Sequence, residues 1–161
     1  MTETNEIKYE YGTYSNKAEA VGLALTLFCQ SRQYHKSSFG TVVTSITNSI
    51  EQGHYLMQLV EGVAVGVICW AMVNESVKND IARQLRTIHG ADYSSGNICF
   101  ITEIAAVYGN GSELVTEAYN RIKLVEAWGI NPSRPTRNPE FPVDVFKIND
   151  SFNYGKYLRG K

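Results

Sequence analysis

Two titratable residues stand in surroundings that could support catalysis. His35 lies in the polar stretch SRQYHKSS, where a neutral imidazole could accept a proton from an attacking amine or activate a nucleophile. Glu103 interrupts the apolar stretch FITEIAAV, and a buried carboxylate needs a partner or a raised pKa. Each also has a purely structural interpretation: His35 as an exposed loop histidine, and Glu103 as a strand residue whose side chain reaches solvent.

A glycine-rich turn and a tryptophan are candidates for binding a substrate. Free amides at the start of a helix could hold a phosphate, a phosphopantetheine arm or a thioester oxygen. Such a turn is formed by Gly109, Asn110, Gly111 and Ser112, although any tight strand-to-helix turn also requires glycines. Trp70 lies inside an apolar strand, where a tryptophan is more often part of the core than a binding platform.

Several classes of enzyme are disfavoured by motifs that the sequence lacks. It contains no G-x-x-x-x-G-K-[ST], G-x-S-x-G or H-E-x-x-H motif, and its histidines and cysteines do not cluster at zinc spacing. We therefore expect no bound metal. Cys29, Cys69 and Cys99 are far apart in apolar surroundings and are predicted to be reduced core residues.

Length and composition favour one ordinary globular domain over residues 1–161. The net charge of −1 shows no bias towards a polyanion, so we expect no nucleic-acid partner. The sequence carries no recognisable secretory signal and no apolar run of about 18 residues, which predicts a cytoplasmic protein without a membrane span.

The hydrophobic pattern predicts an α/β (α+β) domain in which one mixed sheet is covered by helices, in the order α-α-β-β-α-β-α-β. The expected elements are a helix over 16–30, a helix carrying Val42, Ile46 and Ile50 and closed by Gly53, strands over 54–60 and 63–73, a helix from Asn74 to Gly90, a strand over 97–109, a helix from Ser112 to Gly129, a proline-rich loop over 130–142 and a strand over 143–148. We expect strand 97–107 to lie beside strand 63–73, because both are long apolar runs.

Local signals define several of these boundaries. Asn16 with Glu19 suits a capping box at the start of the first helix, and Glu61-Gly62 suits a two-residue hairpin turn. One face of the third helix should carry four apolar residues: Val77, Ile81, Leu85 and Ile88.

Four stretches between about Ser31 and Ile122, taken in order, resemble a bacterial family of lysine acyltransferases that activate pore-forming RTX toxins by fatty-acylating internal lysines. The stretches are SRQYHKSS, HYLMQLV, VAVGVICWAMVNESV and YSSGNICFITEIAAVYGNGSELV. In that family a histidine follows the first helix in a short serine-rich loop, which Tyr34-His35 resembles. A hairpin strand carrying a tryptophan follows, and Cys69-Trp70 is similar to it.

The resemblance implies an acetyltransferase-like fold and a reaction with two protein partners. The acyl donor would be acyl carrier protein, with acyl-CoA as the alternative, and the acceptor would be a protein bearing target lysines. His35 would act as general base, the amides near Gly109 to Ser112 would polarise the thioester carbonyl, and the protein could form a homodimer. We expect His35 at the rim of a concave pocket lined by the C-terminal end of the central strand.

The sequence departs from the family at the acid that partners the histidine. The family has an aspartate on the central strand where this chain has Thr102, and the nearest acid, Glu103, would point to the opposite face of a regular strand. A bulge could turn Glu103 inward, another group could orient His35, or the chemistry could have changed. Thr102 and Glu103 are therefore both candidate site residues.

Two other functions remain open from the sequence. One is a coenzyme-A-dependent acetyltransferase of the same broad fold, and the other is a catalytically inactive binding module that kept the sheet. A screen of acyl donors would separate the two enzymes, and donor binding without turnover would identify the module.

Overall fold

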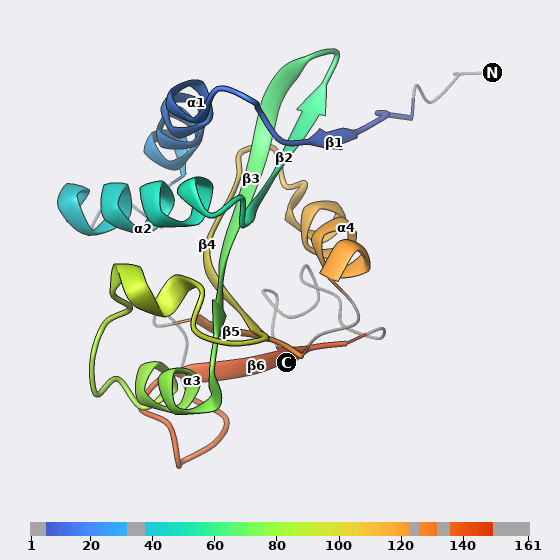
Figure 1. The fold of residues 1–161 in the computed structure, drawn as a ribbon. Helices are drawn as coiled ribbons and strands as arrows, with labels where there is room; N and C mark the ends of the chain where they lie inside the picture. The colour runs from blue at the N-terminus through green and yellow to red at the C-terminus, as the bar shows by residue number, and fades with distance from the viewer. Residues whose placement is uncertain (1–5, 32–37, 123–125, 132–135, 150–161) are drawn as a thin grey trace.

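A computed structural model describes residues 6–31, 38–122, 126–131 and 136–149 of the chain. One six-stranded mixed sheet forms its centre, in the order β1-β2-β3-β4-β5-β6 (Figure 1). Neighbouring strands are antiparallel except for the parallel pair β4 and β5. The strands are β1 (Glu10–Gly12), β2 (Tyr55–Val60), β3 (Val63–Val73), β4 (Ile98–Ala106), β5 (Ala127–Asn131) and β6 (Asp144–Ile148).

Helices cover both faces of this sheet, as the sequence predicts. On one face α1 and α2 bury apolar side chains against β2, β3 and β4, while α3 and the 3-10 helix η2 continue this layer towards the other end of β3 (Figure 1). On the opposite face α4 packs against β3 and β4. The helices are α1 (Lys17–Gln30), α2 (Phe39–Glu51), α3 (Glu75–Ala82), η2 (Gly90–Tyr93) and α4 (Gly111–Ile122).

The two longest strands lie side by side in the middle of the sheet. β3 pairs with β4 from Gly66↔Ala106 to Val73↔Ile98, and neither strand is at an edge. β3 and β4 both contribute side chains to the apolar clusters on both faces of the sheet. This explains why the sequence of each strand is almost continuously apolar. The predicted pairing of strands 63–73 and 97–107 is confirmed.

Local signals in the sequence fix several of the observed boundaries. The Asn16 side chain accepts a hydrogen bond from the Glu19 amide at 3.1 Å and so caps α1. Glu61 and Gly62 have φ angles of 49° and 78°, as a tight hairpin turn with two left-handed residues requires. Gly53 follows α2 with φ 73°, in agreement with the predicted helix stop.

The third helix is shorter than the apolar spacing predicts. α3 ends at Ala82 because Gln84 adopts a left-handed φ of 59°, and Leu85, expected on the buried face, is 70% exposed. Gly90, expected at the end of this helix, instead opens η2. The chain after α3 is held instead by Arg86, which pairs with Asp80 and Asp92.

A strand that the sequence analysis did not predict follows α4. Gly129 was expected to stop a helix, but it lies in the middle of β5, opposite Phe146 of β6. A Cβ on Gly129 would lie 2.8 Å from Cε2 of the Phe146 ring. The glycine therefore permits close packing of two strands rather than helix termination.

No helix in the described part of the chain is long and apolar enough to cross a membrane.

Candidate active site

A β-bulge in the central strand determines where the candidate acid points. On β3, Cys69 lies opposite Glu103 and the next residue, Trp70, lies opposite Ile101, so Thr102 is the extra residue on β4. Cys69 belongs to the apolar cluster under α1 and α2, and Glu103, as its direct partner, lies on that same face. Of the three explanations that the sequence left open, the structure therefore contains the bulge.

The bulge coincides with the point where two strands separate. β4 and β5 pair only at Cys99↔Ala127, Phe100↔Trp128 and Ile101↔Gly129, whereas β4 continues to Ala106. Thr102 is thus the first residue of β4 beyond its last paired position with β5. Backbone groups and side chains at such a fork are available to line a cleft.

Thr102 and Glu103 both line a cavity of about 500 Å³ at this fork. The remaining walls come from the first half of α2, from the end of α3 and the segment 84–89, and from Tyr93 of η2 and Ile130 of β5. This volume lies in the range of about 300–1,000 Å³ that is usual for small-molecule sites. Residues of the segments 40–45 and 81–93 and residue 130, which lie far apart in the sequence, therefore line one cavity together with Glu103.

Polar groups of this cavity are partly ordered by hydrogen bonds. The buried Tyr93 hydroxyl donates to Ser45 Oγ at 3.3 Å, which links η2 to α2 across the cavity. Burial raises the pKa of Tyr93, and the charges of Glu103 and of nearby groups raise it further, so this phenol is protonated at neutral pH. Tyr93 can therefore donate a hydrogen bond but cannot act as a base there.

A charged pair stabilises the wall formed by segment 84–89. Arg86 donates to both carboxylate oxygens of Asp92, at 2.6 and 3.2 Å, and its Nε donates to Asp80 at 3.2 Å. The Arg86 guanidinium holds the pKa of Asp92 below its usual range, and the His89 amide, which donates to the same carboxylate, contributes. The two aspartates compensate the charge of Arg86, so this wall adds no net positive charge to the cavity.

The hydroxyl of Thr102 differs from the hydrogen-bonded polar groups of the cavity. Its Oγ1 is buried and makes no hydrogen bond to the described residues, although the residue lines the cavity. An unsatisfied buried hydroxyl usually costs about 1–3 kcal/mol of stability. The bulge thus turns Glu103 towards the α2 face, and the Thr102 hydroxyl next to it has no partner among the described residues.

The glycine-rich turn predicted to bind the donor is held from inside the protein. Asn110, only 2% exposed, donates to Gln58 Oε1 of β2 and, at 3.4 Å, to the Val65 carbonyl, and accepts a hydrogen bond from the Tyr108 amide at 3.0 Å. Gly66 leaves room for this contact, because a Cβ there would lie 3.2 Å from Asn110 Nδ2. Asn110 therefore positions the turn, while Gly109 and Gly111 flank it.

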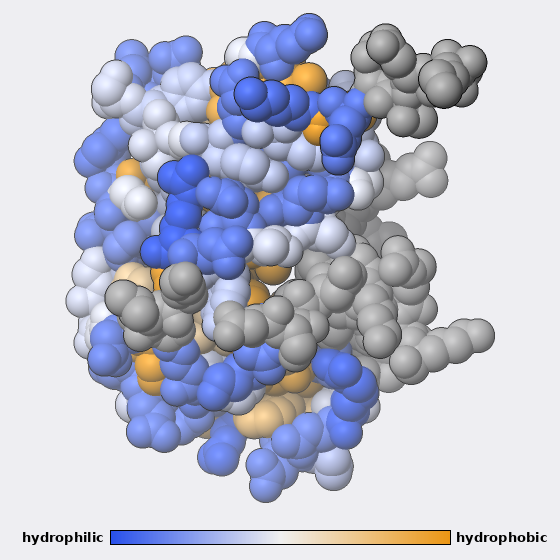
Figure 2. Space-filling model, turned by 90° about the vertical axis from the view of Figure 1, so that its right-hand side faces the viewer, coloured by the Kyte–Doolittle hydropathy of each residue, from blue (hydrophilic) through white to orange (hydrophobic). Residues whose placement is uncertain are grey.

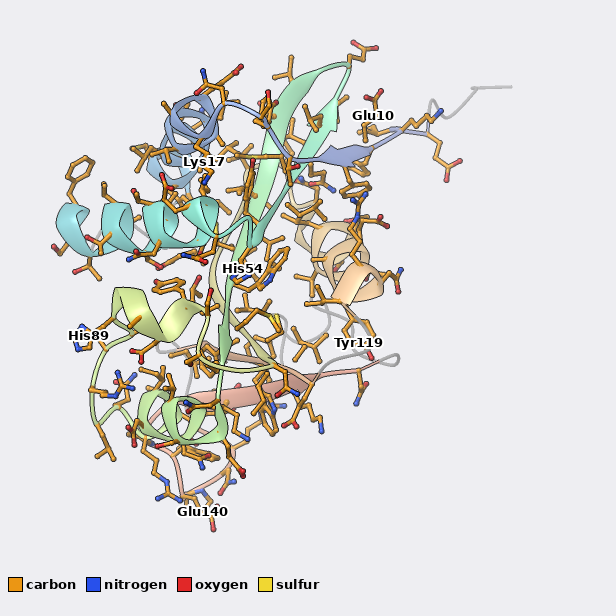
Figure 3. All side chains as sticks on the ribbon, viewed as in Figure 1. Glu10, Lys17, His54, His89, Tyr119 and Glu140 are labelled. Atoms are coloured by element: carbon orange, nitrogen blue, oxygen red, sulfur yellow. The ribbon has the colours of Figure 1, made fainter. Side chains whose placement is uncertain are left out.

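Trp70 lies away from the cavity, on the face covered by α4. It is 7% exposed within the apolar cluster on that face, and its ring stacks on His54 with centroids 6.3 Å apart. Figure 3 shows His54 in the interior beside β2 and β3, below α2. Burial lowers the pKa of His54 and so favours its neutral form. In this structure Trp70 is surrounded by core residues, and its predicted role in substrate binding stays a prediction.

The residue that the sequence singles out as the base, His35, lies outside the described residues, so its predicted place at a pocket rim is untested. Of the other histidines, His54 is in the interior and His89 lies at the outer edge of the molecule (Figure 3). His89 lines the cavity through the segment that follows α3.

Sequence reasoning did not find Ser45, Tyr93 or Arg86 as cavity residues. Ser45 lies between apolar positions of an amphipathic helix, and Tyr93 lies in a segment expected to be a loop. The one available signal was the odd apolar residue Tyr93 among the polar residues of ADYSSG, which indicates a buried side chain inside a loop.

Comparison with known proteins identifies a family that this chain resembles in sequence. A sequence model of the RTX toxin acyltransferase family matches residues 13–134. The lysine-acyltransferase RtxC of Vibrio cholerae serotype O1 is 33% identical over 55 residues, which cover 34% of this chain and 36% of that relative. The chain therefore matches about a third of this curated relative's length.

Solved structures with the same fold include proteins described as GNAT family members or GNAT-like domains. The loading GNATL domain of CurA from Lyngbya majuscula superposes with a TM-score of 0.57 at 13% identity, covering 82% of this chain and 71% of that one. A GNAT family acetyltransferase from Brucella melitensis, solved with acetyl-CoA, gives a TM-score of 0.55 at 8% identity, covering 89% and 90%. At such identities the likeness shows the fold alone, and it confirms the predicted acetyltransferase-like fold. Because the family model extends over most of the sequence, the chain belongs to the RTX toxin acyltransferase family.

Proposed function

We propose that this protein transfers a fatty acyl group from acyl carrier protein to internal lysines of a target protein, a toxin. The observation that carries the proposal is the bulge at Thr102, which brings Glu103 into a cavity at the fork between β4 and β5. Membership of the family supports the reaction class. The fork offers one place where a thioester, an attacking amine and a carboxylate can meet.

His35 is the proposed general base, and Glu103 its proposed partner. The lysine Nζ attacks the thioester carbonyl as His35 removes its proton, the N–C bond forms, and the C–S bond breaks. The departing thiolate takes up the proton that His35 received, so the base is regenerated. A carboxylate beside the imidazole stabilises the imidazolium formed in between.

The position of α2 supports this assignment. His35 precedes Gly40 by five residues in the sequence, and Gly40 and Thr41, in the first turn of α2, line the cavity that contains Glu103. The candidate base is therefore close in sequence to one wall of the site.

The surface around the start of α4 supports a carrier-bound donor over free coenzyme A. A hollow of about 330 Å³ there is lined by Tyr11, Ser112, Glu113, Thr116 and Glu117. Its two carboxylates would repel the nucleotide phosphates of coenzyme A, and the described residues that line it include no lysine or arginine. Figure 2 shows that this side of the molecule is mainly hydrophilic, with apolar surface only in small patches.

The test is acyl transfer by the purified protein to a toxin fragment with lysines, followed by mass spectrometry. Two donors, acyl carrier protein and coenzyme A, should carry the same acyl chain, and we expect faster transfer from the carrier. His35→Ala and Glu103→Gln should each lower the rate by roughly 10²–10⁴-fold, as loss of acid–base assistance does. Glu10→Gln, which changes an exposed strand carboxylate, is the matched control and should behave as the unchanged protein.

Other results would contradict particular parts of the proposal. If Thr102→Ala abolishes transfer while Glu103→Gln does not, Thr102 carries the role assigned to Glu103. Equal or faster transfer from the coenzyme A thioester would favour the coenzyme-A-dependent enzyme. Donor binding by the unchanged protein without turnover would identify an inactive binding module.

A further inference from the structure

We propose that the apolar inner end of the cavity beside β4 holds the acyl chain, and that Ile81, Ile88 and Ile130 set the chain length the protein accepts. This inference rests on the proposed function and deepens it, because nothing in the transfer chemistry itself specifies how long the chain should be. It concerns the far end of the site, away from the reacting atoms.

The lining of the cavity changes from polar to apolar with depth. Its exposed residues are polar side chains or glycine and lie on two facing segments, with Gly40, Thr41 and Thr44 on α2 opposite Gln84, Thr87 and His89 after α3. Its most deeply buried residues on this face of the sheet are Phe100, Tyr93 and Ile81, which are 1%, 2% and 7% exposed and belong to one apolar cluster. The cavity therefore has a polar mouth and an apolar inner end.

The distance along β4 from the bulge at Thr102 to the apolar end of the cavity suits an acyl chain attached to a thioester. Thr102 and Glu103 line the cavity, and Phe100 precedes Thr102 by two residues on β4. At about 3.3 Å per strand residue this places the apolar wall roughly 7 Å from the bulge. An acyl chain whose carbonyl lies at the bulge would extend along β4 towards α3.

The packing around this end shows where the chain would stop. Ile81 of α3 belongs to the apolar cluster on this face, and Ile88 and Ile130 pack against the same cluster while remaining partly exposed. The three isoleucines come from three different elements, and all of them line the cavity. Larger side chains there would shorten the space, and smaller ones would lengthen it.

The acceptor lysine does not fit this end of the cavity. An ammonium group would leave water for a wall of isoleucine and phenylalanine side chains, at a large cost in free energy. An alkyl chain has the opposite preference, since each methylene that leaves water increases binding about fourfold. The lysine fits better at the polar mouth, next to Glu103.

The experiment measures chain-length profiles of the full-length protein. Transfer from acyl carrier protein is followed for saturated chains of graded length, and binding of the fluorescent fatty acid cis-parinaric acid is competed with free fatty acids of the same lengths. Ile88→Trp fills the apolar end from a partly exposed position, and Ile81→Ala enlarges it. Leu85→Trp is the matched control, because Leu85 lies on the same segment, is 70% exposed and does not line the cavity. Thermal unfolding checks that each variant is folded.

We expect Ile88→Trp to lower transfer of the longest accepted chain at least tenfold while leaving the shortest chain within about twofold, since pocket changes of methylene size discriminate by tenfold or more. Ile81→Ala should move the optimum to longer chains, and Leu85→Trp should leave the profile unchanged. The binding competition should shift in the same direction as the transfer profile.

The outcomes separate this inference from the proposed function. Transfer with an unchanged profile in Ile88→Trp and Ile81→Ala overturns the inference and leaves the function standing. Binding that depends on chain length and on Ile88, without any transfer, overturns the function and retains the acyl site. Neither binding nor transfer by the unchanged protein overturns both.

Discussion

A single extra residue decides which side chains of β4 meet in the cavity. Without the bulge, Glu103 would share a face with Ile101, whose side chain packs under α4. With Thr102 inserted, Glu103 shares a face with its partner Cys69, under α1 and α2. The sequence alone left Thr102 and Glu103 as alternative candidates, and the backbone irregularity places Glu103 on the face covered by α1 and α2.

Replacing the unpaired hydroxyl should increase stability. Thr102→Val keeps the shape and the β-branched side chain but removes the buried Oγ1 that has no partner among the described residues. We expect the free energy of unfolding to rise by about 1 kcal/mol, because an unsatisfied buried group is replaced by an apolar one. Urea unfolding measures the change.

The matched control for this substitution is Thr44→Val. Thr44 also lines the cavity, but its Oγ1 donates to the Gly40 carbonyl at 2.7 Å on an exposed helix surface. Loss of that bond should leave stability the same or slightly lower. A loss of more than about 1 kcal/mol in Thr102→Val would mean that the hydroxyl has a partner in solution.

Elements with strong local signals were predictable, and elements defined by tertiary contacts were not. The capped helix α1, the apolar stripe of α2 and the hairpin of β2 and β3 follow from side-chain periodicity and turn residues near in sequence. The mixed α/β fold follows from their order. Of the candidate site, Glu103 and Thr102 were identified as residues, but the cavity that contains them required the bulge and the chain path after α3.

Two elements show why periodicity fails. Leu85 and Ile88 continue the apolar spacing of α3, yet the ion pairs of Arg86 with Asp80 and Asp92 hold that segment in another path. Gly129 looks like a helix stop because nothing nearby in the sequence indicates the Phe146 ring packed against it. Both outcomes depend on partners that the local sequence does not specify.

Gly129 and Gly22 differ in the space available for a Cβ atom, and this difference can be tested by substitution. Gly129→Ala would place a Cβ 2.8 Å from Phe146 Cε2, and such overpacking should cost about 1–3 kcal/mol. Gly22→Ala, in the interior of α1 with nothing within 4 Å of its Cβ, should instead stabilise by about 0.5–1 kcal/mol. In chemical unfolding we expect the two substitutions to change the free energy of unfolding with opposite signs. Equal effects of the two substitutions would refute this account of Gly129.

The sheet joins two parts of unequal strength. β2, β3 and β4 are paired over long registers and are covered by helices on both faces. β5 and β6 pair well with each other, but only three residue pairs join β5 to β4, where the fork begins. The separation of β4 and β5 that opens the cavity therefore also leaves few contacts between the β5–β6 pair and the rest of the sheet.

Hydrogen exchange should reveal this difference across the whole molecule. Amides of β3 and β4 lie in the middle of the sheet and should exchange only through global unfolding, whereas those of β5 and β6 should exchange at least about tenfold faster through opening at the fork. Mass spectrometry of peptides from each strand measures both rates under native conditions. Gly129→Ala should accelerate exchange in β5 and β6 more than in β3, because the strained contact with Phe146 lies within that hairpin. Uniform protection across β3 to β6, or equal acceleration everywhere in Gly129→Ala, would show that the six strands open as one unit and that the fork is no weaker than the rest of the sheet.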